Sequence, residues 1–291
     1  MSKPVLHSIH VYPLKAAAGH APREAVVEPW GPAGDRRWVL TDEKNRIITQ
    51  RARPRMALVC VEALADGAIL ASAPGREPLT VPVPAPGGTT TVEIWNDKVE
   101  GVPAGVAADA WFSDFLGIAV RLVHLDDPAT RRPIDPRFAR PGETVSFADG
   151  YPLLVTTLAS LDALNTLIAR GDRPEEGPLP MNRFRPNLVV GGTAAWAEDG
   201  WSRIAVGEVV LRVAKMCGRC VVTTTDQTTA ERGREPLRTL ARHRRFGDKL
   251  VFGQNLVPES PGSVRVGDPV RILEQGFARG TPTPGTAVES V

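Results

Sequence analysis

Proline and glycine interrupt this chain so often that long regular elements have little room. The sequence contains 27 of each among 291 residues. Both residues break helices and strands, and the runs between them are short and rich in valine, isoleucine and leucine. This texture predicts a mainly β protein with accessory helices, of the α+β class.

Nine apolar runs are expected to form strands because they are rich in β-branched residues or alternate in polarity. They span residues 6–12, 24–29, 36–42, 57–64, 90–95, 119–125, 187–192, 203–215 and 263–273. In each of the last two, a short VGE or VGDP turn separates two apolar segments. That arrangement predicts two tight hairpins of a barrel or sandwich.

Helical patterns are few. Residues 156–171 begin with hydroxyl side chains that can cap a helix, and Gly171 can end it. Residues 233–245 place Pro236 in a first helical turn, and residues 108–117 predict a third, short helix. The segment 122–150 is long, charged and rich in proline, so we expect it to wrap a surface or to border a site.

The domain organisation follows from the proline- and glycine-rich stretch at residues 73–91. We expect a β-rich N-terminal domain over residues 1–95 and a second domain over residues 96–275. Residues 276–291 lack periodic apolar positions and predict a flexible tail.

Charge and composition exclude several classes of protein. The 35 basic and 33 acidic residues give a net charge of +2, too even for nucleic acid to be the main partner. The longest apolar runs are shorter than the roughly 20 residues of a membrane helix, so we expect no membrane span. The N-terminus shows no signal-peptide pattern, and three cysteines suit a reducing compartment. The sequence therefore predicts a cytoplasmic protein.

Cys217 and Cys220 form a C-x-x-C motif. A redox dithiol should open a helix, but the VVTTT that follows is poor helix material. A zinc site needs further ligands besides the two cysteines of the motif. Cys60 lies in an expected strand, and the five histidines do not supply the missing ligands. Two interpretations remain open. Arg219 favours a thiolate, which is a good ligand for a heavy redox-active metal, or both cysteines are small buried hydrophobes.

Several blocks occur in an order that resembles one family. They are VYPLKAAAG, GDRRWVLTD, RFRPNLVV, AAWAEDGW, CGRCVVTTTD, REPLRTL, FGQNLV and VRVGDPV. The chain resembles the MOSC-domain molybdoproteins, in the two-domain group that includes the mitochondrial amidoxime-reducing component and its bacterial relatives. The resemblance implies an N-terminal β domain packed on a MOSC β-barrel, and it favours a monomer.

The resemblance also implies a molybdenum cofactor, a molybdopterin. Cys220 would bind the metal directly, with Cys217 as a neighbour. The implied cofactor-binding residues come from several segments: Lys15, Arg36, Thr157, Ser160, Arg185, Asn187, Gly218, Arg219 and Cys220. Asp226 is a candidate for positioning substrate or moving a proton, and a role in capping its own loop is the alternative.

Two positions depart from the family pattern. Residues 16–18 are alanines where relatives commonly have serine and another polar residue, and Gln227 replaces a proline. The first change predicts that a hydroxyl contact to the cofactor is missing.

The implied activity is reduction of N-hydroxylated compounds such as amidoximes, hydroxylamines and N-hydroxylated bases. The chain has no dinucleotide-binding fingerprint, no P-loop and no iron–sulfur cysteine set, so electrons must come from elsewhere. The resemblance implies a separate haem or flavin electron-transfer protein as the donor. A run of basic residues could receive it, although a solvated helix face is an equal alternative. The run comprises Arg232, Arg234, Arg238, Arg242, Arg244, Arg245 and Lys249. Alternative functions are a carrier of the cofactor and a sulfur carrier that uses Cys220.

Overall fold

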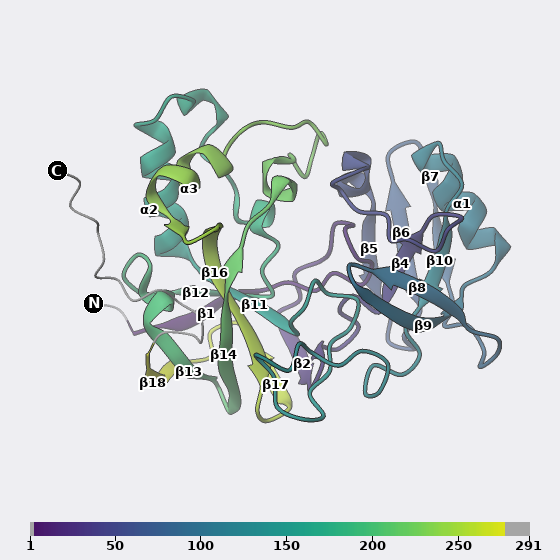
Figure 1. Ribbon diagram of the computed structural model, residues 1–291, viewed down its shortest axis with the longest axis horizontal. Coiled ribbons are helices and arrows are strands. Elements are labelled where there is room, and N and C mark those ends of the chain that lie inside the picture. The colour runs from purple at the N-terminus through teal and green to yellow at the C-terminus, as the bar shows by residue number, and fades with distance from the viewer. Residues whose placement is uncertain (1–2, 277–291) are drawn as a thin grey trace.

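The computed structural model describes residues 3–276, which form two halves that lie side by side (Figure 1). Within these residues the largest sheet has eight strands. Its spatial order is β1 (Val5–Ile9), β12 (Leu188–Gly191), β11 (Leu153–Thr157), β16 (Lys249–Pro258), β14 (Val209–Gly218), β13 (Trp201–Val206) and β18 (Val270–Gln275), with β15 (Arg245–Phe246) paired to β16. The sheet curls, and a bridge between Val5 and Pro269 brings β1 beside the chain that enters β18. The expected barrel is a half-barrel.

The other half is built on two smaller sheets. One has the order β4 (Trp38–Thr41), β10 (Arg121–His124), β9 (Asp97–Pro103) and β8 (Thr90–Ile94). The other is the meander β5 (Cys60–Ala63), β6 (Ile69–Ala73) and β7 (Arg76–Val81). Helix α1 (Val106–Leu116) packs against them and buries Phe112 and Phe115 in a core that also contains Trp38.

A third small sheet pairs an early segment of the chain with a late one. Its order is β17 (Gly262–Arg265), β2 (Glu24–Glu28) and β3 (Gly31–Pro32). Both β1 and β2 therefore pair with strands that come much later in the sequence, β12 and β17, as Figure 1 shows. Leu6 and Ile9 of β1 are fully buried in the core of the half-barrel.

Helices α2 (Leu158–Ala169) and α3 (Leu237–His243) lie over the half-barrel (Figure 1). The Oγ1 of Thr157 caps α2 by accepting a hydrogen bond from the backbone N–H of Ser160. Short 3-10 turns complete the described elements: η1 (Pro54–Leu58), η2 (Pro174–Glu176), η3 (Met181–Phe184), η4 (Ala197–Gly200) and η5 (Val221–Thr224).

The mainly β class with accessory helices is confirmed, and the three expected helices are present. One expected hairpin is also confirmed, because β13 and β14 pair through Val206 and Val209. The second hairpin prediction is wrong. Strands β17 and β18 do not pair with each other, because β17 joins β2 and β18 joins β13. Gly267 (φ 99°) and Pro269 turn the chain between these two sheets.

The division expected between residues 95 and 96 falls in the turn that joins β8 to its hydrogen-bonded neighbour β9. Strand β10 belongs to the same sheet and ends at His124. We therefore propose that the division lies in the segment 125–152, with strands β1, β2 and β3 tied to the C-terminal half. The tail prediction for residues 276–291 falls almost wholly outside the described residues. Within residues 3–276 the helices are too short or too polar to cross a membrane.

Candidate functional site

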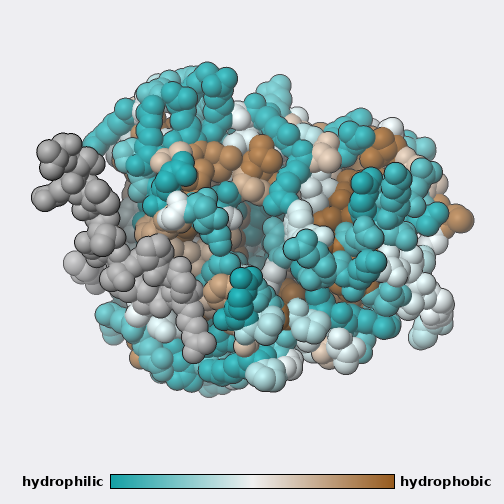
Figure 2. Space-filling model, in the orientation of Figure 1, coloured by the Kyte–Doolittle hydropathy of each residue, from teal (hydrophilic) through white to brown (hydrophobic). Residues whose placement is uncertain are grey.

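A cavity lies between the two halves, where the surface is hollowed in Figure 2. Its empty space, including the part that is open to solvent, is about 870 Å³. Both halves and the connecting segment supply the lining. The residues are Lys15, Ala16, Arg36, Thr49, Arg51, Trp95, Ala148, Asp149, Gly150, Tyr151, Leu153, Leu154, Phe184, Arg185, Asn187, Cys217, Gly218, Arg219, Cys220, Val222, Thr223 and Asn255.

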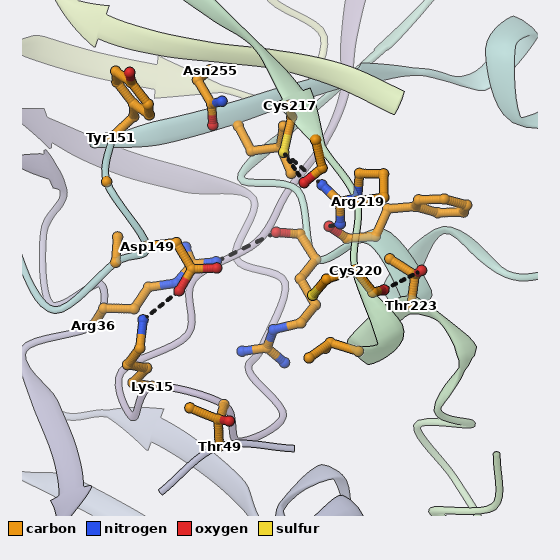
Figure 3. Close-up of a pocket in the computed structure, with 18 of the residues that line it drawn as sticks. Lys15, Arg36, Thr49, Asp149, Tyr151, Cys217, Arg219, Cys220, Thr223 and Asn255 are labelled. Carbon is orange, nitrogen blue, oxygen red and sulfur yellow. Dashed lines mark hydrogen bonds and ion pairs between the residues drawn. The ribbon is translucent and has the colours of Figure 1, made fainter. Parts of the chain in front are cut away.

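Cys220 lines this cavity at the point where β14 has ended and η5 begins (Figure 3). Its backbone is extended, and its carbonyl accepts hydrogen bonds from the N–H and hydroxyl of Thr223. The thiol receives one contact from the other half of the protein, because Nη2 of Arg51 lies 3.4 Å from Sγ. The turn therefore fixes the backbone and leaves the sulfur at the cavity wall.

Arg219 holds the cysteine motif in place. Its Nη1 lies 2.8 Å from Sγ of Cys217, and Nη2 donates to the carbonyl oxygen of Phe184 at 2.6 Å. Its backbone N–H donates to Leu250 of β16. The two cysteines of the motif therefore have different partners. Cys217 contacts its neighbour Arg219, whereas the thiol of Cys220 contacts Arg51 in the other half of the protein.

Two arginines stack on one buried tyrosine. The guanidinium carbons of Arg36 and Arg185 lie 4.4 and 4.3 Å from the ring centre of Tyr12. Both arginines have left-handed backbones, with φ of 48° and 54°. Such conformations are uncommon outside glycine, and they direct both side chains toward the cavity.

Arg36 and Arg185 differ in their partners. Nη1 of Arg36 is bound to Asp35 at 2.6 Å and to Oδ1 of Asn187 at 3.1 Å. The guanidinium of Arg185 donates no hydrogen bond to any residue between 3 and 276, and burial lowers its pKa to about 10. A partly buried guanidinium with free donors is suited to an anionic ligand.

Asn187 is a buried connector. Its Nδ2 donates to the carbonyl of His10 and to Asp35, and its Oδ1 accepts from Arg36 and from the backbone N–H of Leu154. Its side chain has therefore used its donors and acceptors within the protein, and it lines the cavity as part of the wall.

Lys15 and Asp149 face each other on the other side of the cavity (Figure 3). The Nζ of Lys15 lies 2.6 Å from Oδ1 of Asp149 and donates to the carbonyl of Phe147 at 2.7 Å. Burial lowers the pKa of Lys15 to about 8, although the carboxylate of Asp149 acts in the opposite direction. The buried Arg132 donates to the carbonyls of Ser146 and Ala148 and so holds this segment. The expectation that segment 122–150 borders a site is confirmed.

Thr157 and Ser160 lie outside the cavity lining. Both side chains are fully buried, and the cavity lining does not include them. Their hydroxyl groups contact each other and Oε2 of Glu198, and Ser160 also accepts from the N–H of Trp196. The two residues cap helix α2 inside a buried polar cluster, so nothing in their position brings them to a ligand.

Asp226 is also outside the cavity lining. Its Oδ1 accepts from the backbone N–H groups of Thr228 and Thr229, and its Oδ2 accepts from Arg183. Despite some burial, these hydrogen bonds lower the pKa of Asp226. The geometry is that of an aspartate that caps its own loop.

The two departures from the family pattern have structural roles. Ala16 lines the cavity in a left-handed conformation (φ 67°). Gln227 exchanges a pair of amide hydrogen bonds with Gln50, at 3.0 and 3.1 Å. This amide pair joins the two halves beside the Arg51 segment.

Three of the seven residues of the basic run form ion pairs within the protein, and a fourth donates to backbone carbonyls. Arg238 and Arg242 both pair with Asp172, and Arg244 pairs with Asp199. Arg232 donates to the carbonyls of Gln50 and Arg51. Within the described residues, three further members form no ion pair and donate no side-chain hydrogen bond to a carbonyl. They are Arg234, Arg245 and Lys249.

Sequence reasoning missed several lining residues that have no motif of their own. Arg51 belongs to the basic RARPR segment, and Trp95 is the last residue of an expected strand. Asp149 ends a segment that was expected to border a site, but the sequence does not say which residue would face it. Their positions depend on how the halves meet.

The donor set fits an anionic cofactor whose metal takes one protein sulfur. Five cationic side chains line the cavity against one carboxylate, Asp149: they are Lys15, Arg36, Arg51, Arg185 and Arg219. Phosphate is bound in this way by arginine and lysine donors. Within residues 3–276 no cluster of three or more histidine, cysteine or acidic side chains could hold a metal. A metal at Cys220 would therefore take its other ligands from outside the protein.

Comparison with known proteins agrees with this architecture. Residues 3–119 match the MOSC N-terminal beta barrel domain, and residues 142–271 match the MOSC domain. The chain is 32% identical to mitochondrial amidoxime-reducing component 1 of Mus musculus, over 91% of this chain and 81% of that protein. The Homo sapiens protein of the same name is 32% identical over 91% of this chain and 82% of its own length. Molybdenum cofactor sulfurase of Danio rerio is 30% identical over 88% of this chain and 32% of its own length. The chain belongs to the MOSC family, in the two-domain group of the amidoxime-reducing components.

Proposed function

We propose that this protein is a molybdenum-cofactor-dependent reductase of N-hydroxylated compounds, such as amidoximes, hydroxylamines and N-hydroxylated bases. The observation that carries the proposal is the thiol of Cys220 at the wall of a cavity lined by five cations. The names of the relatives at 32% identity support the same activity.

The reaction is a two-electron reduction. An amidoxime, two electrons and two protons give an amidine and water, so the N–O bond breaks and its oxygen leaves as water. The bound cofactor would supply the two-electron oxygen-atom chemistry, and the protein supplies binding, orientation and electrostatics. In this scheme Cys220 binds the metal, while Arg36, Arg185 and Lys15 face the anionic parts of the cofactor.

Electrons come from a separate haem or flavin protein in this proposal. The charges left free for docking an acidic partner are Arg234, Arg245 and Lys249, since Arg238, Arg242 and Arg244 have internal partners. A reduction rate that loses its salt dependence in an Arg245→Glu, Lys249→Glu variant, but keeps it in Arg242→Glu, would support this surface. A cytoplasmic location and a monomeric state belong to the same proposal.

The first experiment measures molybdenum and molybdopterin per chain after expression in a host that makes the cofactor. We expect about one of each in the wild type, and loss of the metal or a changed electronic spectrum in Cys220→Ala. Cys217→Ala is the matched control and should keep both. A wild type with neither metal nor pterin would refute the proposal. Turnover of an amidoxime with reduced viologen then separates a reductase from a protein that only carries the cofactor.

A sulfur-carrier function is the second candidate, because one relative at 30% identity is named a molybdenum cofactor sulfurase. Cys220 would then hold a persulfide, and its exposure to the cavity suits that role equally. A cyanide-labile sulfur on Cys220, found without molybdenum, would support this alternative.

A further inference from the structure

Trp95 has an unusual position for a large aromatic residue. It occupies the first position of the two-residue turn between β8 and β9, with a φ of 56°. A positive φ at this position of a hairpin turn favours glycine, asparagine or aspartate, so a bulky aromatic residue is strained there. Such strain concentrates at functional sites.

The ring of Trp95 lines the cavity and is 46% exposed. Two cations lie over the indole: the guanidinium carbon of Arg51 is 4.1 Å from a ring centre and Nζ of Lys15 is 5.7 Å away. A guanidinium stacked on tryptophan keeps the ring in a defined orientation.

Arg51 connects this ring to the thiol that is proposed to bind the metal. Its Nη2 lies 3.4 Å from Sγ of Cys220. Within residues 3–276, Arg51 has no carboxylate partner that would account for its position. The guanidinium therefore lies between the indole and the thiol, and the indole stands next to the proposed reaction centre.

We propose that Trp95, held by Arg51, is an aromatic platform that selects planar, conjugated N-hydroxylated substrates over small aliphatic ones. Aryl amidoximes and N-hydroxylated heterocycles present flat π surfaces that can stack on an exposed indole. A substrate with only a methyl group gains nothing from this surface. The inference rests on the proposed function, because it places the platform beside Cys220.

The test measures binding without turnover. Benzamide oxime and acetamide oxime carry the same reacting group and differ in the aromatic ring. The cofactor-loaded, oxidised protein is titrated with each by calorimetry, without a reductant. We expect the wild type to bind benzamide oxime about tenfold more tightly. Trp95→Gly should reduce that preference to about twofold or less, and Trp95→Tyr should keep most of it.

Trp95→Gly is expected to fold, because glycine accepts the left-handed backbone without strain. Trp196 offers a matched control: it has a φ of 63° and stacks on Arg244 at 4.2 Å, but it does not line the cavity. Trp196→Phe should leave the preference unchanged. Arg51→Gln should weaken the preference because the ring loses its support. Molybdenum and pterin content is measured for every variant.

Equal affinity for the two oximes in the wild type, or a preference that survives Trp95→Gly, would overturn the platform. Turnover with reduced viologen judges the proposed function separately. Reduction of both oximes without an aromatic preference would support the proposed reductase activity and contradict the proposed role of Trp95. A binding preference that depends on Trp95, without turnover of either oxime, would support the proposed role of Trp95 and contradict the proposed reductase activity.

Discussion

Lys15 and Asp149 form an ion pair of 2.6 Å although 134 residues separate them in the chain. The lysine side chain is 6% exposed, whereas the carboxylate is 73% exposed and faces the cavity. The pair therefore fixes the connecting segment against the N-terminal half at one side of the site.

This pair predicts a pH dependence of stability in the cofactor-free protein. The folded pKa of Lys15 is lowered to about 8, below its ordinary value of 10.5. Between these two values the unfolded chain binds the proton and the folded chain does not, so the contribution of Lys15 to the free energy of unfolding rises with pH. The free energy of unfolding of the wild type, minus that of Lys15→Met, should therefore rise from pH 8 to pH 10.5. Urea denaturation across that range checks it, and a constant difference would contradict it.

Asn187→Ala should lower the free energy of unfolding by about 2 kcal/mol, since buried partners lose their hydrogen bonds. The groups left unsatisfied are Asp35, Arg36 and the N–H of Leu154. Urea denaturation measures the loss, and Asn182→Ala, at an exposed position, is the control. We also expect lower pterin retention in Asn187→Ala, because Arg36 loses a bond that orients it.

Thr157→Ala should cost about 1 kcal/mol of stability, because the N-cap of α2 is lost. Molybdenum and pterin content should stay at the wild-type level, since Thr157 does not line the cavity. Loss of the cofactor in a variant that keeps its thermal stability would return Thr157 to the binding site.

Asp226→Asn should leave kcat within about twofold of the wild type, because Asp226 does not line the cavity. The amide can still accept the hydrogen bonds from Thr228 and Thr229 that form the turn. Steady-state kinetics with reduced viologen tests this. A large loss of kcat with a shifted pH profile would instead show that Asp226 transfers protons during turnover.

Local patterns predicted much of the fold. The runs around Leu6, Val189 and Val213 alternate or cluster as strands do, and they are strands. The sequence analysis did not predict strands β7 and β16, for two different reasons. β7 lies in a proline-rich stretch that resembles a linker, and β16 contains Gly253 in a left-handed conformation (φ 81°). Strand β7 pairs with its neighbour β6 across a tight turn, whereas β16 pairs with the distant β11, which a local pattern does not contain.

Residues from the family motifs line the cavity, and their role in binding a cofactor stays a prediction. Lys15, Arg36, Arg185 and Cys220 all line the cavity. Thr157 and Ser160 were misplaced, because the hydroxyl groups of a helix cap look the same in sequence whether they face a ligand or a buried Glu198. Arg51 and Trp95 were missed because their places depend on the contact between the two halves.

The pairing of β1 with β12 affects how the protein is made. The first strand emerges early, but its partner β12 (Leu188–Gly191) is not yet synthesised. At about 5 to 20 residues per second, the roughly 180 residues between them take about 10 to 40 seconds. During that interval the apolar side chains of Leu6 and Ile9 have no core to enter. The wall that carries Cys220 is translated later still, and the lining of the cavity is complete only once Asn255 has been synthesised.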